Sequence, residues 1–185
     1  MTERKFIFAS FIFLSFLFLY STYLGYSLQY QAEKLEWILR KFFETFRGVS
    51  NNLVLLSLFI FVNNAVKSLV AMLGGFFFGL LPILFVLSNG FILGTMIKLR
   101  IEDWGIFGIL LAIVPHGIIE VPSVLLACSY GVWLGYRFAL SLFRGERFLP
   151  YLRVALLVYV KVILPLLLVA ALVEVFITPL LIRNI

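Results

Sequence analysis

The residues best suited to chemistry in this chain are one histidine and two glutamates that stand inside long apolar segments. His116 and Glu120 lie in the stretch PHGIIEVP, and Glu174 lies in the stretch AALVEVFITP. Residues four apart share one face of a helix, so His116 and Glu120 are expected to point the same way. One imidazole and two carboxylates can hold a divalent metal ion with an open coordination position. A divalent metal site formed by His116, Glu120 and Glu174 is therefore one hypothesis for this sequence.

Three asparagines stand in the neighbouring apolar runs and extend this set of candidate ligand-binding residues. Asn63 and Asn64 are adjacent, and Asn89 lies in a segment rich in glycine. Asn63 and Asn64 are expected to converge with the histidine and the two glutamates in one polar cluster. Such a cluster can hydrogen-bond across helices and fix the register of a bundle. Ionisable residues inside a membrane also mark pathways for ions or small solutes, which gives a second interpretation beside the metal site.

The motifs of common enzymes are missing from the sequence. The chain has a single histidine, so it lacks the second histidine of H-E-x-x-H, and HG-x-x-E is a different motif. No Ser/His/Asp arrangement and no phosphate-cradling glycine loop accompanies it, so no catalytic residue is predicted and a non-enzymatic role is favoured. The only cysteine, Cys128, lies in an apolar run, which excludes a disulfide framework and a CxxC site.

The composition indicates the environment in which these apolar segments are stable. Of the 185 residues, 63% are hydrophobic and 13% are charged, and the mean hydropathy is +1.12. Soluble domains are usually about 45–50% apolar and about 25% charged. We therefore predict a multi-pass protein of the cell membrane, with the lipid bilayer as its first partner. The net charge of +6 comes from Lys and Arg residues between apolar runs, which favours positively charged loops over nucleic-acid binding.

Three regions follow from the pattern of apolar and charged residues. Residues 1–26 form a nearly unbroken apolar run after Arg4 and Lys5, too long for a signal-peptide core and without an A-x-A-like site, so we predict a retained first transmembrane helix. Residues 27–50 mix charge with apolar residues at helical spacing, which is typical of an amphipathic helix at the membrane interface. Residues 51–185 form the polytopic helical core.

Two apolar blocks in this core, 53–99 and 104–142, are each too long for one ordinary spanning helix. We divide the first at Asn63–Ser68 and the second at PHGIIEVP, where Pro115 suits the first turn of a new half-helix. With a last helix at about 154–176, the scheme has six crossings. It places both termini on one side and groups Lys98–Arg100 with Arg137–Arg153 on the other side. The predicted fold class is all-α, a multi-pass transmembrane helical bundle with broken or re-entrant helices and an amphipathic interfacial helix.

Four motifs in order resemble the stage II sporulation protein M family. They are Asn63-Asn64, Asn89-Gly90 followed by Gly94, His116-Gly117 followed by Glu120, and Glu174 followed by Thr178-Pro179, so the resemblance covers roughly 42–179. The family's bacterial namesakes act in engulfment during sporulation with partners that remodel peptidoglycan, and the family extends to organisms that do not sporulate. The resemblance implies a membrane scaffold or component of a complex with membrane or envelope proteins. A homo-oligomer formed through the glycine-rich faces also fits the sequence. An ion or solute channel or transporter and a metal-binding membrane protein are the alternatives.

Overall fold

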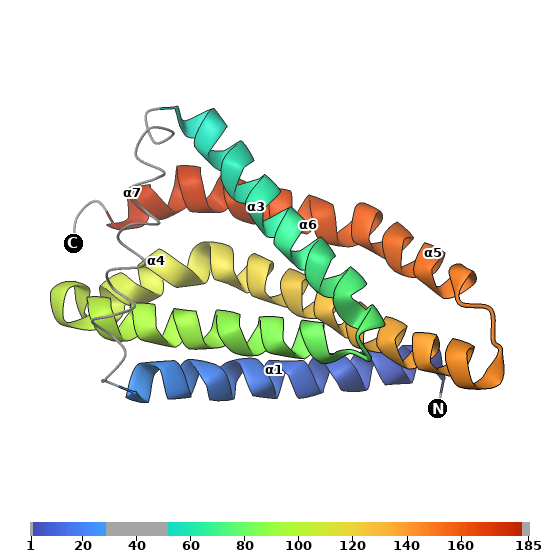
Figure 1. Ribbon diagram of the computed structural model, residues 1–185. Helices are drawn as coiled ribbons and strands as arrows, with labels where there is room; N and C mark the ends of the chain where they lie inside the picture. The colour runs from blue at the N-terminus through green and yellow to red at the C-terminus, as the bar shows by residue number, and fades with distance from the viewer. Residues whose placement is uncertain (1, 29–51, 183–185) are drawn as a thin grey trace.

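The computed structural model describes residues 2–28 and 52–182, and every regular element within these ranges is a helix (Figure 1). Four of the helices are long and apolar enough to cross a membrane. The chain is therefore an all-α helical bundle, as the composition predicts. The amphipathic helix expected at 27–50 lies, except for its first two residues, outside the described residues.

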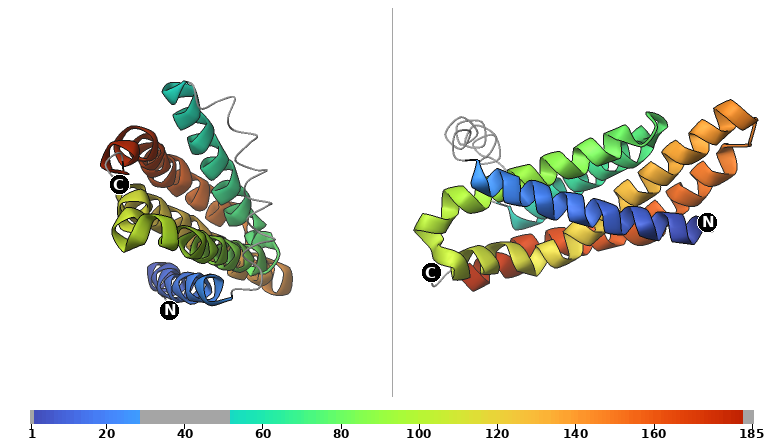
Figure 2. Two further views of the ribbon diagram at one scale, coloured as in Figure 1. Left: turned by 90° about the vertical axis from the view of Figure 1, so that its left-hand side faces the viewer. Right: turned by 90° about the horizontal axis from the view of Figure 1, so that it is seen from below.

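The first helix, α1, spans Glu3–Ser27 and has 25 residues. At about 1.5 Å per residue it is long enough to cross the hydrocarbon core. It lies along one side of α4 in Figure 1 and in the left-hand view of Figure 2, while α3 and the last helix lie on the other side. The contact with α4 is close: a β-carbon added at Gly94 would lie 1.9 Å from the Thr22 carbonyl oxygen, and one added at Gly90 would lie 2.0 Å from the Ser21 hydroxyl oxygen. These two glycines therefore set the distance between α1 and α4.

The second long helix, α3 (Leu53–Leu73), begins at Asn52, whose side chain accepts hydrogen bonds from the N–H groups of Val54 and Leu55. It runs without interruption through Asn63 and Asn64, so the division predicted at Asn63–Ser68 is wrong. The chain turns later, through the 3₁₀ helix η2 (Gly74–Phe76) and Gly79, which has φ of 79°. Glycine adopts this left-handed conformation without the steric penalty of a side chain, which explains where the turn lies.

The longest element, α4 (Leu80–Arg144), folds back on itself at Gly105, where φ is 61° and ψ is 175°. Its two limbs, residues 80–104 and 106–144, run in opposite directions (Figure 1). The second limb is helical through both Pro115 and Pro122, so the half-helix predicted to start at Pro115 is wrong. Pro122 has no N–H group to donate to the Ile118 carbonyl, and membrane helices tolerate a proline of this kind within a packed bundle.

The C-terminal part of the described chain is one helical rod with two wider, π-helical turns. Its elements in order are α5 (Leu149–Val158), η3 (Tyr159–Ile163), α6 (Leu164–Leu172), η4 (Val173–Ile177) and α7 (Thr178–Ile182). Tyr159 and Glu174 lie within the two π-helical turns. Turns of this kind are frequent at functional sites, so both positions are of interest.

The two ends of the bundle differ from those of the six-crossing scheme. Arg137 forms an ion pair with Glu3 at the start of α1, whereas the Lys98 ammonium lies 5.5 Å from the ring centre of Tyr26 near the end of α1. Segments 98–103 and 137–144 are thus at opposite ends, and α7 ends opposite the start of α1 (Figure 1). The prediction that Lys98–Arg100 and Arg137–Arg153 lie on the same side of the membrane is therefore wrong. The prediction that both termini lie on one side is also wrong. The reason is that the run 104–142 forms one long limb instead of two short helices.

Candidate functional site

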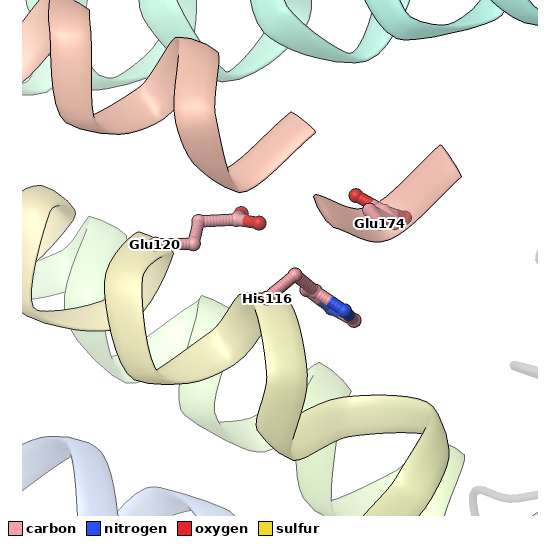
Figure 3. A group of neighbouring side chains, drawn as sticks. All are labelled: His116, Glu120 and Glu174. Carbon is pink, nitrogen blue, oxygen red and sulfur yellow. The ribbon is translucent and has the colours of Figure 1, made fainter. Parts of the chain in front are cut away.

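His116, Glu120 and Glu174 meet between α4 and the last helix. Each offers one ligand atom, an imidazole nitrogen or a carboxylate oxygen, and these atoms all lie within 4.8 Å of one another. Figure 3 shows the carboxylates of Glu120 and Glu174 reaching toward each other from facing helices, with the His116 side chain beside them. His116 and Glu120 share a face because they are one helical turn apart on the second limb of α4. All three side chains are half-buried within segments that are long and apolar enough to cross a membrane.

Glu174 is positioned by the π-helical turn η4. The turn precedes Pro179, which lacks an N–H group and so leaves a carbonyl one turn earlier without its usual partner. The Thr178 hydroxyl donates to the Val173 carbonyl oxygen, five residues back, at 3.3 Å. The sequence E-x-x-x-T-P thus provides both the carboxylate and the residues that shape the turn around it.

A third element, α3, reaches the same cluster through Asn64. The Asn64 side-chain amide donates to a carboxylate oxygen of Glu120 at 2.9 Å, and the Asn63 amide donates to the Asn64 side-chain oxygen at 3.2 Å. The charge of Lys67, one turn further along α3, also acts on Glu120. The structure therefore brings Asn63, Asn64, His116, Glu120 and Glu174 together from three parts of the chain.

One nitrogen of His116 remains unsatisfied in this arrangement. The Nδ1 atom is buried and has no hydrogen-bond partner among residues 2–28 and 52–182. Buried polar atoms are nearly always paired in folded proteins, so an atom of this kind calls for an explanation such as an ion or a bound ligand. His116 Nδ1 is therefore a candidate ligand-binding atom.

A cavity of about 220 Å³ lies beside His116 and Glu120, between α1 and the two limbs of α4. Asn89 lines this cavity from the first limb, and its side-chain amide donates to the Phe85 carbonyl of its own helix at 2.7 Å. Most of the remaining lining is apolar, including Phe18 and Met96. Asn89 therefore lines the cavity beside the cluster, and His116 and Glu120 belong to both.

A second polar contact between helices was not predicted from the sequence. The buried Tyr159 hydroxyl in η3 lies 3.0 Å from the Ser68 hydroxyl and donates to the Ala65 carbonyl, both on α3. Ser68 also donates to the carbonyl of Asn64 at 2.7 Å. In the sequence, Asn64 and Ser68 are four residues apart, which places them on one face of α3. This spacing indicates that Ser68 faces the same helix interface as Asn64.

The cluster offers metal-ligand and hydrogen-bonding chemistry. Glu120 and Glu174 supply carboxylate oxygens, His116 supplies an imidazole, and Asn64 orients one of the carboxylates. Carboxylates in an apolar interior are costly unless paired or shared with a proton or a metal ion. The arrangement can therefore hold helices together, hold a cation, or do both.

A protein-family model described as Stage II sporulation protein M matches residues 6–179 of the chain. This range is wider than the part that carries the four motifs, because it begins within α1. No curated protein and no solved structure matches the chain.

Proposed function

The chain belongs to the Stage II sporulation protein M family, and on this basis we propose that it is a multi-pass cell-membrane scaffold, a component of an envelope complex. In this proposal the intramembrane polar cluster fixes the helices of the scaffold in register. The observation that carries it is the hydrogen bond from Asn64 on α3 to Glu120 on α4, at 2.9 Å.

The energetic argument concerns contacts between helices in lipid. Apolar side chains gain little by leaving lipid for a helix interface, so small residues and polar contacts determine how membrane helices pack. Glycines bring α1 against α4, the Asn64–Glu120 bond joins α3 to α4, and the Tyr159–Ser68 contact joins the last helix to α3. Each polar contact contributes about 0.6–2 kcal/mol. Together these contacts support a bundle with one defined arrangement, which a scaffold needs.

The cavity beside the cluster favours a second candidate, an ion or solute pathway. It measures about 220 Å³, and His116, Glu120 and Asn89 form polar parts of its wall. Channels and transporters place ionisable residues beside such cavities. The continuous helices at Asn63-Asn64 and PHGIIEVP weaken this candidate, because binding sites of transporters are typically formed by interrupted helices.

Replacing one asparagine distinguishes the two candidates. Asn64→Leu removes the contact between α3 and α4, and the scaffold proposal expects a free energy of unfolding lower by about 0.6–2 kcal/mol in detergent. Asn89→Leu is the matched control, because Asn89 donates only within its own helix among the hydrogen bonds observed. Glu120→Gln, tested in proteoliposomes, would abolish ion or solute flux if the pathway candidate held. Flux in the wild type that Glu120→Gln removes would contradict a purely structural role.

The complex itself is tested in native membranes. A photo-crosslinking residue introduced into segment 27–50 is expected to give adducts with other envelope proteins. If the only adducts are with a second copy of the chain, the scaffold is a homo-oligomer and not a component of an envelope complex. Absence of any adduct, with the chain present at normal level in the membrane, would contradict the scaffold proposal.

A further inference from the structure

We propose that His116, Glu120 and Glu174 bind a divalent first-row metal ion, zinc in the first place, inside the helical bundle. This metal site rests on the proposed function only for its location in a membrane. It adds to that function what the polar cluster binds. It is carried by the ligand geometry, the charge, the unsatisfied histidine nitrogen and the cavity beside the site.

The three ligand atoms have nearly the spacing that a metal ion requires. They lie within 4.8 Å of one another. Imidazole nitrogen and carboxylate oxygen bind zinc at about 2.0–2.2 Å, so atoms around one ion stand about 3–3.5 Å apart. Small rotations of three side chains, two of them on one helix face, close that difference. An imidazole with two carboxylates suits zinc or manganese better than calcium or magnesium, which favour all-oxygen sites.

The charge at the site also favours a divalent cation. Glu120 and Glu174 face each other across the interface between α4 and η4, in segments apolar enough to lie in the membrane. Lys67 acts on Glu120 and offers one positive charge. A divalent ion shared by both carboxylates would compensate Glu174 as well, and neighbouring carboxylates are commonly stabilised in this way.

The surroundings of the ligands resemble the outer shell of a metal site. Asn64 donates to one oxygen of Glu120 at 2.9 Å, and such a bond orients a ligating carboxylate. The buried Nδ1 of His116 has no hydrogen-bond partner among the described residues. This nitrogen is therefore not committed to a hydrogen bond with another described residue.

The cavity provides the entry path that a metal site needs. Two of the three ligands, His116 and Glu120, line it, and so does Gly117 between them in sequence. A β-carbon added at Gly117 would meet only the Ile113 Cγ2 atom, at 3.5 Å, which is an ordinary contact. A side chain at Gly117 can therefore begin without a clash at its β-carbon, in a position that lines the cavity.

Zinc binding to the purified protein tests the proposal. The protein in detergent is stripped with a chelator, and ZnCl₂ is titrated in competition with a chromophoric chelator, with MnCl₂ in parallel. We expect one zinc ion per chain and at least a 100-fold weaker affinity in Glu174→Gln. Glu102→Gln, an exposed glutamate at the turn between the α4 limbs, is the matched control and should bind as the wild type does. Asn64→Leu is expected to weaken binding about 10–100-fold, as for other outer-shell residues.

Thermal unfolding keeps the test valid if a variant folds poorly. Without metal, Glu174→Gln should unfold at the same or a higher temperature than the wild type, because it removes one of two facing carboxylates. With zinc, the wild type should rise in Tm and Glu174→Gln should not. No stoichiometric zinc or manganese in the wild type, or equal binding by Glu174→Gln, would overturn the proposal. The stability of Asn64→Leu, measured in the protein stripped of metal, would still decide the scaffold proposal separately.

The rate of zinc release tests the entry path. Gly117→Leu is expected to slow release to a chelator at least tenfold while leaving one site per chain. Gly117→Ala, which adds only the β-carbon, should exchange zinc at nearly the wild-type rate. An unchanged rate in Gly117→Leu would contradict the cavity as the path.

Discussion

The contact between α1 and α4 depends on Gly94, and Gly94→Ala tests this dependence. The added β-carbon would lie 1.9 Å from the Thr22 carbonyl oxygen and 2.8 Å from the Tyr26 backbone nitrogen. An ordinary contact is at least 3.4 Å, so the two helices must separate by about 1.5 Å at this point. Both obstructing atoms are backbone, so no side-chain rotation can relieve the overlap. Overpacking of this kind costs about 1–3 kcal/mol.

The measurement is the free energy of unfolding in mixed micelles of a mild detergent and SDS. Gly117→Ala is the matched control, because the same substitution in the same element meets no atom closer than 3.5 Å. It should be neutral or stabilising by up to about 1 kcal/mol, since alanine favours a helix over glycine. Because both variants gain the helix preference of alanine, this gain cancels, and we expect Gly94→Ala to be less stable than Gly117→Ala by about 1–3 kcal/mol. Equal stability of the two variants would refute the close packing of α1 on α4.

Two further contacts can be tested in the same assay. Tyr159→Phe removes the hydroxyl that contacts Ser68 and Ala65 on α3, and we expect a loss of about 0.5–1.5 kcal/mol, against no loss for Tyr23→Phe at an exposed position. Arg137→Gln removes the ion pairs with Glu3 and Glu146, and we expect a loss of about 1.5–3 kcal/mol and faster proteolysis near the start of α1. Arg137→Lys should recover only part of that loss, because lysine lacks the planar fork that contacts two carboxylates. No difference between Arg137→Gln and the wild type would contradict the attachment of α1 at this end.

The helical class could be predicted from the sequence because it depends on the average hydropathy of long segments. The family could be predicted because it depends on the order of four motifs. Apolar runs of sufficient length specify membrane helices, whatever the contacts inside the bundle. The proximity of Asn64, Glu120 and Glu174, by contrast, depends on how three helices pack, and spacing along one helix specifies only the pair His116 and Glu120. The family resemblance supplied the motifs but not the distances among them.

The positions of the turns do not follow from the polar residues. The sequence predicts breaks at Asn63-Asn64 and PHGIIEVP, since polar backbone and side chains are costly in lipid. In the structure Asn64 bonds to Glu120 on another helix, so α3 remains continuous. The turns occur instead at Gly79 and Gly105, both with positive φ. In this chain, Asn64 marks a contact between helices, and the glycines that mark turns are those with positive φ, while Gly90 and Gly94 mark the close contact of α1 with α4.

A double-mutant cycle between Asn64 and Glu120 tests the central claim that α3 and α4 are joined inside the membrane at this cluster. The variants are Asn64→Leu, Glu120→Leu and the pair, with Glu102→Leu replacing Glu120→Leu as the control cycle. We predict a favourable coupling energy of about 0.6–1.7 kcal/mol for Asn64 with Glu120 and none for Asn64 with Glu102. Strictly additive effects of Asn64→Leu and Glu120→Leu would contradict the contact and, with it, the proposed role of the cluster.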